Sequence, residues 1–109
     1  MKRAYFITGT DTGVGKTLIA CALLHAFARS GKSVVGMKPV AAGCDALQCE
    51  DVAALRAAST VDAPREWINP YALPAPVAPH LAAQQAGIDL EIAPMLDAFR
   101  QLQTMADVV

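Results

Sequence analysis

Residues Gly9 to Thr17 read Gly-Thr-Asp-Thr-Gly-Val-Gly-Lys-Thr, and this stretch decides the fold. It follows an apolar, β-prone run at residues 4–8 and leads into residues 17–30, where apolar side chains recur at helical spacing. Glycines between a strand and a helix let successive backbone N–H groups turn toward a phosphate at the positive end of the helix dipole. The Lys16 ammonium can then reach the β and γ phosphates, and the Thr17 hydroxyl can ligate Mg²⁺. The stretch therefore predicts a phosphate-binding loop for a nucleoside triphosphate.

This loop is one residue longer than the common pattern G-x-x-x-x-G-K-[ST]. Five positions before Gly15 stands Thr10, so Gly9 comes one position too early. A strand-to-helix turn that merely needs glycines is the plain alternative, but such a turn has no use for Lys-Thr directly after its last glycine. Nucleotide binding is the better interpretation.

A second short apolar strand is expected at residues 33–37, after a helix that Gly31 ends and before Pro39. Strand, helix and strand together form a βαβ unit with a right-handed crossover. The chain has 109 residues, of which 54% are hydrophobic and only 6% aromatic, which suits one tightly packed domain. We therefore expect an α/β fold in a single domain over residues 1–109. Its architecture would be a P-loop NTPase-like three-layer α/β/α arrangement with a mostly parallel sheet, incomplete at the C-terminus.

The rest of the chain is less regular. The stretch at 62–79 contains five prolines, which disfavour a central strand or a long helix and indicate an ordered surface loop, with an interdomain linker as the alternative. Gly87 should end a short helix, and Asp89 should cap a longer one. The other expected segments are a loop at 41–43, helices at about 50–58 and 80–85, and the start of a strand at 106–109.

Composition excludes several classes of partner. The net charge is −1, so no broad basic surface is available for nucleic acid or an anionic membrane. No apolar run approaches the roughly 20 residues that span a bilayer, and the start at Met1-Lys2-Arg3 leads into a strand rather than a signal peptide. We expect a cytoplasmic protein whose three cysteines, at positions 21, 44 and 49, are reduced thiols without a disulfide or a zinc site.

Lys38 is the second candidate functional residue. It stands at the carboxyl end of the strand expected at 33–37, the edge of an open α/β sheet where ligands bind. Alone it would be interpreted as a solvated lysine at a strand end. The long phosphate loop followed about twenty residues later by Lys-Pro-Val-Ala-x-Gly favours a functional lysine instead.

With these residues in view, the sequence closely resembles the dethiobiotin synthetase family. The likeness extends in order along nearly the whole chain. It covers residues 5–17, 20–24, 38–43, 50–51 with the alanine-rich helix that follows, 69–71, 78–80 and 106–109.

The resemblance implies a definite reaction. MgATP, CO₂ and 7,8-diaminononanoate would give dethiobiotin, ADP and phosphate through a carbamate and a carbamic-phosphoric anhydride. It further implies that Lys38, Lys16 and Thr12 are catalytic, and that Thr17 and Asp51 are magnesium ligands. The nucleotide contacts that it implies are Gly13, Val14, Gly15, Lys16, Thr17, Leu18 and Asp51.

Some positions depart from the family or invite other roles. Ala42 stands where some members have a serine that can hydrogen-bond the substrate, so its side chain cannot make that contact. His80 is interpreted as structural rather than as a base. Trp67, Tyr71 and Phe99 are interpreted as packing residues rather than as an adenine stack.

The family's chain is longer than this one. After the strand expected to start at residues 106–109, it continues with Val-Glu-Gly-Ala-Gly-Gly, which supplies a further magnesium ligand. The resemblance also implies a homodimer. We expect an incomplete nucleotide site and an exposed apolar edge that lowers solubility in isolation. Two alternatives remain open: a nucleotide-switch ATPase of the partitioning or division type, whose early loop lysine is replaced here by Thr10-Asp11-Thr12, and an inactive fragment of the synthetase.

Overall fold

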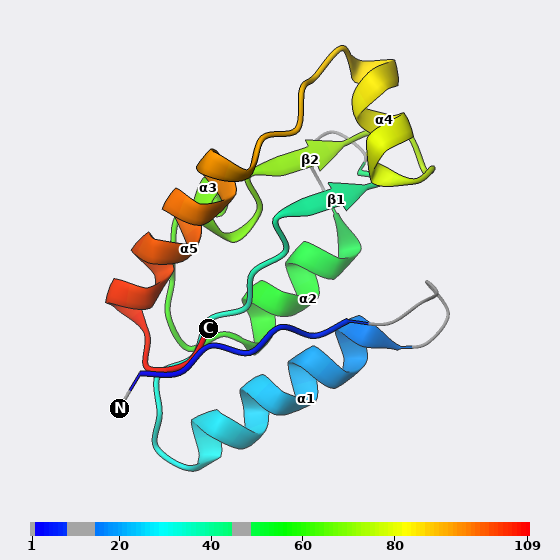
Figure 1. Cartoon of the computed structure of the whole chain (residues 1–109). Coiled ribbons are helices and arrows are strands. Elements are labelled where there is room, and N and C mark those ends of the chain that lie inside the picture. The colour runs from blue at the N-terminus through cyan, green and yellow to red at the C-terminus, as the bar shows by residue number, and fades with distance from the viewer. Residues whose placement is uncertain (1, 9–14, 45–48) are drawn as a thin grey trace.

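A computed structural model describes residues 2–8, 15–44 and 49–109 of the chain. Five helices and two strands are formed by these residues (Figure 1). In chain order they are α1 (Lys16–Arg29), β1 (Val40–Ala42), α2 (Glu50–Ala58), α3 (Arg65–Ile68), β2 (Tyr71–Leu73), α4 (Pro79–Ala86) and α5 (Ile92–Met105).

The strands form the centre of a parallel arrangement that backbone hydrogen bonds extend. β1 pairs with β2 in parallel, with Val40 opposite Tyr71. On the other side, Val108 forms parallel bridges to both Val34 and Arg3. The spatial order is therefore residues 3–5, 107–109, 33–42 and 71–73, and the termini of the chain lie side by side (Figure 1). The mostly parallel sheet predicted from the sequence is confirmed.

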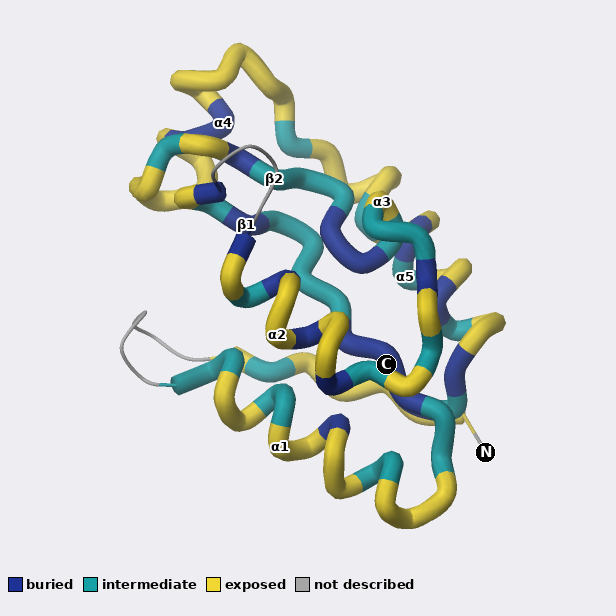
Figure 2. Tube along the Cα trace, turned by 180° about the vertical axis from the view of Figure 1, so that it is seen from behind, coloured by how far each residue is buried: buried dark blue, intermediate teal, exposed yellow. Residues whose placement is uncertain are grey.

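The helices cover the central strands from two sides. Val34 and Val35 are adjacent in sequence and both fully buried, so the strand through them has a packed layer on each face. Val34 packs with Leu24 of α1 and Leu55 of α2, whereas Val35 belongs to a separate cluster that includes Leu102 of α5. The buried residues lie between these layers, and the outer sides of the helices are exposed (Figure 2). This is the three-layer α/β arrangement.

Three helices lie where the sequence places them. α1 ends at Arg29, and Gly31 follows with φ 88°, a left-handed conformation that suits glycine at a helix C-terminus. α2 begins at Glu50 with two acidic residues in its first turn, which the helix dipole favours. α4 has Pro79 in its first turn and ends at Gly87 with φ 69°. Turn chemistry and dipole thus set these helix ends.

The buried strand predicted at residues 4–8 is wrong. Only residues 3–5 make backbone hydrogen bonds with the paired segment 107–109, and Phe6 is 87% exposed. On α1, which follows, Leu18 is 76% exposed. Tyr5 of this edge stacks on Phe27 of α1, whereas the Phe6 and Leu18 side chains face outward. The exposed apolar edge that the sequence predicted is present.

The second predicted strand is confirmed only in part, because residues 33–35 pair in parallel with residues 107–109 but form no longer strand. The sequence placed it at 33–37 with a stop at Pro39, yet β1 forms at 40–42, where a loop was expected. Pro39 is tolerated because the ladder to β2 uses its carbonyl, which accepts a hydrogen bond from the Tyr71 N–H at 3.0 Å. A proline lacks only the donor, and this position does not need one.

The loop predicted at 62–79 is also wrong. It contains α3 and β2, and Leu73 at the end of β2 is fully buried. The prolines flank these elements: Pro64 is the N-cap residue of α3, and Pro70 directly precedes β2. Further along, the cap predicted at Asp89 is displaced, because α5 begins at Ile92 with Glu91 as its N-cap residue.

Two of the three cysteines form a disulfide, contrary to the prediction of reduced thiols. Cys44 and Cys49 are bonded, with their Cα atoms 4.6 Å apart, and Cys21 is free. Although the two cysteines are five positions apart in the sequence, this distance is within the range that a disulfide can bridge. In the described parts of the chain, no helix has the length and apolarity needed to cross a membrane.

Candidate nucleotide site

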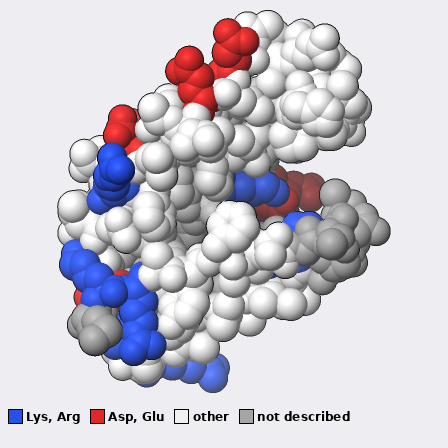
Figure 3. Space-filling view, viewed as in Figure 1, with Lys and Arg blue, Asp and Glu red and all other residues white. Residues whose placement is uncertain are grey.

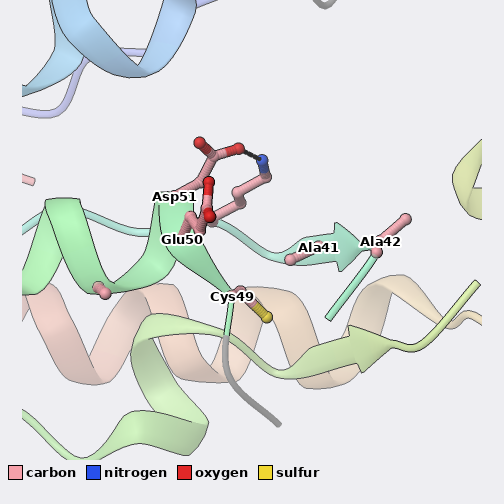
Figure 4. Close-up of a pocket in the computed structure, with 8 residues that line it drawn as sticks. Ala41, Ala42, Cys49, Glu50 and Asp51 are labelled. Atoms are coloured by element: carbon pink, nitrogen blue, oxygen red, sulfur yellow. Dashed lines mark hydrogen bonds and ion pairs between the residues drawn. The ribbon is translucent and has the colours of Figure 1, made fainter. Parts of the chain in front are cut away.

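A hollow of about 460 Å³ lies between the end of β1 and the start of α2 (Figure 4). Figure 3 shows a notch on this face, with basic and acidic side chains next to each other at its inner end. The lining residues are Lys38, Ala41–Gly43, Cys49–Asp51 and Ala53. The hollow therefore sits where the chain passes from the parallel strands to a helix, the region where α/β folds bind ligands.

Lys38 and Asp51 form an ion pair across this hollow. Lys38 comes from the segment before β1 and Asp51 from the first turn of α2, and the bond joins Lys38 Nζ to Asp51 Oδ2 (dashed in Figure 4). The side chains are 33% and 46% exposed. The hydrogen bond from Lys38 holds the pKa of Asp51 below its ordinary value, although partial burial acts in the opposite direction. Asp51 is thus kept ionised.

The start of α1 reaches the same carboxylate. Thr17, and then the positive charge of Lys16, lower the pKa of Asp51 further. Gly15, immediately before α1, has φ 78°, a conformation that glycine adopts without strain. Of the predicted site residues, Lys16, Thr17, Lys38 and Asp51 are therefore brought together around one point.

The chemistry of this cluster fits magnesium bound together with a nucleotide. The Thr17 hydroxyl and the Asp51 carboxylate offer the hard oxygen ligands that Mg²⁺ prefers, and Mg²⁺ sites in nucleotide enzymes take most other ligands from phosphate and water. Within residues 2–8, 15–44 and 49–109, no three His, Cys, Asp or Glu side chains gather as a metal site. A separate metal site made only of such side chains is therefore not formed in this part of the chain.

Other predicted residues lie elsewhere. Thr12, Gly13 and Val14 fall outside the described residues. Leu18 points away from the core on α1 and does not line the hollow, and His80 is exposed at the start of α4. Ala42 does line the hollow, where it contributes only a methyl group. Among the aromatic residues interpreted as packing, Trp67 packs against the central buried cluster.

Sequence reasoning missed three residues near the site. Glu50 lines the hollow beside Asp51. Cys21 lies one turn after Thr17, and burial together with the negative charge of Asp51 raises the pKa of its thiol. Asn69 is buried and donates a hydrogen bond to the Lys38 carbonyl. The only sequence signal for Asn69 was its place in the Asn-Pro-Tyr run, which carries no role by itself.

A parallel sheet with a lysine and a threonine at the start of its first helix defines a P-loop nucleotide-binding domain. The model of one protein family, described as an AAA domain, matches residues 3–109, and the chain belongs to that family. Its similarity to curated proteins lies with the ATP-dependent dethiobiotin synthetases BioD. The protein from Nitrosospira multiformis is 57% identical over the whole chain, and those from Aromatoleum aromaticum and Xanthomonas axonopodis are each 51% identical over 98% and 97% of it. The chain covers 48%, 49% and 49% of these relatives, about half of their length.

Proposed function

We propose that the full-length protein carrying this chain converts 7,8-diaminononanoate, CO₂ and MgATP to dethiobiotin, ADP and phosphate. The meeting of Lys38 with Asp51, Thr17 and Lys16 carries this proposal, because it joins a phosphate-binding helix start to a second cation from a neighbouring segment. The similarity to ATP-dependent dethiobiotin synthetases supports it.

The reaction balances in three steps. One substrate amine adds to CO₂ and loses a proton, which gives a carbamate. A carbamate oxygen then attacks the γ-phosphorus of ATP and displaces ADP, which gives a carbamic-phosphoric anhydride. The second amine attacks the carbonyl carbon of this anhydride, closes the cyclic urea and expels phosphate.

The residues of the cluster match the electrostatic demand of the second step. A carbamate and a triphosphate repel each other, and cations placed between them offset that repulsion as charge shifts in phosphoryl transfer. Lys16 would bind the β and γ phosphates, and Lys38 would bind the carbamate and the transferred phosphoryl group. Thr12 is proposed to contact the carbamate. These roles require Lys38 to stay protonated.

Thr17 and Asp51 are the residues that would hold Mg²⁺, and Gly13, Val14, Gly15 and Leu18 are proposed to contact the nucleotide. The bound ion would neutralise phosphate charge. In this structure the Asp51 carboxylate accepts a hydrogen bond from Lys38. Nucleotide and metal would compete with Lys38 for Asp51, which releases the ammonium toward the carbamate. The homodimer implied by the family resemblance remains a prediction.

The test is a Lys38→Ala substitution in the full-length protein. We expect ring closure to fall by about two orders of magnitude or more, the scale seen when a preorganised transition-state contact is removed. Binding of MgATP, measured by isothermal titration calorimetry, should be largely retained because Lys16 and the phosphate loop remain. Lys32→Ala is the matched control, since Lys32 lies outside the hollow. Unaltered turnover by Lys38→Ala would contradict the proposal.

A further inference from the structure

One asparagine lies buried beneath the Lys38 end of the hollow. Asn69 is the only asparagine in the sequence. It is 2% exposed, and among the described residues it is the only polar or charged residue that is buried. Burial of an amide is unfavourable unless its hydrogen bonds are made, so the partners of this side chain show what it does.

Both amide hydrogens of Asn69 are used on main-chain carbonyls. Nδ2 donates to the Lys38 carbonyl at 2.7 Å and to the Tyr71 carbonyl at 2.9 Å. Lys38 lies two residues before β1, and Tyr71 is the first residue of β2. The side chain therefore bridges the two strands just before their ladder begins.

The local sequence explains why a side chain is needed here. The Asn69 N–H is already committed to the Arg65 carbonyl at 2.8 Å, and Pro70 has no N–H to donate. On either side the backbone pairing is regular, with Lys38 N–H donating to the Ile68 carbonyl and Tyr71 N–H to the Pro39 carbonyl. The Asn69 amide replaces the missing backbone donor, so the Lys38 main chain is held on both its N–H and its carbonyl.

Asn69 also touches the segment that carries Asp51. The Sγ atom of Cys49 lies 3.9 Å from Asn69 Oδ1, and because this sulfur is in a disulfide the approach is a packing contact. Cys49 is the N-cap residue of α2, and Asp51 follows in the first turn of that helix. One buried side chain thus contacts both segments that supply the ion pair, without itself lining the hollow.

We propose that Asn69 is a positioning residue for phosphoryl transfer. It fixes the main chain at Lys38 and the start of α2 relative to each other, which sets where the Lys38 ammonium stands. This inference rests on the role of Lys38 in the proposed function. Asn69 acts through Lys38 and contacts no substrate.

The hydrogen bonds are tested without any activity. In the full-length protein labelled with ¹⁵N-asparagine, the side-chain NH₂ signals that disappear in Asn69→Ala identify Asn69, the one asparagine of residues 1–109. We expect both of its protons to exchange with water far more slowly than those of an unstructured asparagine peptide. Exchange as fast as in that peptide would overturn the proposal.

The positioning role is tested by kinetics of the full-length protein. Asn69→Ala should lower kcat for ring closure by about ten- to a hundredfold, the scale expected for a small misplacement of a catalytic group. The KM for MgATP should change little, since the side-chain hydrogen bonds of Asn69 go to the Lys38 and Tyr71 carbonyls. The control is Leu102→Ala, which removes a fully buried side chain of α5 without a bond to Lys38 and should leave kcat per folded molecule unchanged.

Wild-type kcat in Asn69→Ala, or an equal loss in both variants, would contradict the positioning role. If Asn69→Ala does not fold, Asn69→Ser, which keeps one donor of shorter reach, takes its place with the same expected loss of kcat. Absence of ring closure by the wild-type protein would contradict the proposed function instead. In that case the exchange experiment alone decides whether Asn69 holds the Lys38 carbonyl.

Discussion

The Lys38 ammonium is bonded to the Asp51 carboxylate, whose pKa is also lowered by Thr17 and Lys16. Three segments distant in sequence therefore share one carboxylate. The pair is partly exposed, so water weakens the attraction between its charges and its contribution to stability is small. Its larger effect is on orientation, since it holds two proposed functional groups at the same hollow.

This pair predicts how Asp51 titrates. Its pKa is lowered chiefly by the hydrogen bond from Lys38, so the Asp51 pKa in Lys38→Met should rise toward the ordinary value near 3.9. A lowered pKa in the folded state stabilises the protein at pH values above the unfolded-state pKa. That contribution is lost as the pH falls through the lowered value. NMR titration of the side-chain carboxyl carbon measures the shift, and an unchanged Asp51 pKa in Lys38→Met would contradict it.

The control for this titration is Asp107. Its pKa is lowered by hydrogen bonds from the backbone and then the side chain of Ser33, and not by Lys38. The Asp107 pKa should therefore be the same in Lys38→Met and in the wild-type protein.

Ser33 and Asp107 give a second prediction, because each donates a backbone N–H to the other's side chain. Ser33 N–H donates to Asp107 Oδ2 at 3.0 Å, and Asp107 N–H donates to Ser33 Oγ at 2.8 Å. Asp107→Ala should lower the free energy of unfolding at pH 7. Since the Asp107 pKa is depressed, the difference from wild type should shrink as the pH falls below about 4. Urea denaturation at pH 7 and pH 3 measures it, and an equal difference at both values would show that the carboxylate charge plays no part.

Gly36 leaves no room for a side chain. A Cβ placed there would lie 2.9 Å from Cδ2 of Leu55 and 3.1 Å from Cδ1 of Leu24, where α1 and α2 pack over the strand segment. Gly36→Ala should destabilise the chain by about 1–3 kcal/mol, as overpacking of a buried contact does. Gly31→Ala serves as the comparison for a loss of stability without crowding. Its φ of 88° would strain the backbone of an alanine, but no atom lies within 4 Å of the added Cβ. Thermal unfolding measures both, and an unchanged melting temperature for Gly36→Ala would refute the crowding.

The Cys44–Cys49 disulfide predicts a simple pattern of alkylation. In the denatured, unreduced chain one thiol, Cys21, should react with iodoacetamide, and after reduction all three cysteines should react. The bridge closes a short loop, for which the chain-entropy relation gives about 2 kcal/mol of stabilisation. Cys44→Ser should lose about this amount under oxidising conditions and nothing under reducing ones. Three modified cysteines without prior reduction would show that the bond is absent.

Local patterns predicted four of the five helices, but they missed α3 and the pairings between distant segments. The ends of α1 and α4 follow from Gly31 and Gly87, whose left-handed backbone is a local requirement. β2 could not be found this way, since its three residues lie in a proline-rich stretch and become a strand only through pairing with β1. The buried strand predicted at 4–8 failed for the same reason, because burial depends on neighbours that the local pattern does not specify.

For the candidate site as well, the sequence predicted the features set by local motifs and missed those set by contacts across the fold. The sequence predicted the motif at Lys16 and Thr17 and the helix start at Asp51, because residue type and spacing indicate their chemistry. The bond between Lys38 and Asp51, the disulfide and the role of Asn69 each depend on distances across the fold. No periodicity in the sequence encodes them.

The position of residues 107–109 affects the order in which the chain can assemble during synthesis. They hydrogen-bond to residues 3–5 on one side and to residues 33–35 on the other. Residues 3–5 therefore have no strand partner during synthesis until about a hundred more residues have followed them. Until then the backbone N–H and C=O groups of this segment are unpaired, and such an open strand edge favours chaperone binding or aggregation of the nascent chain.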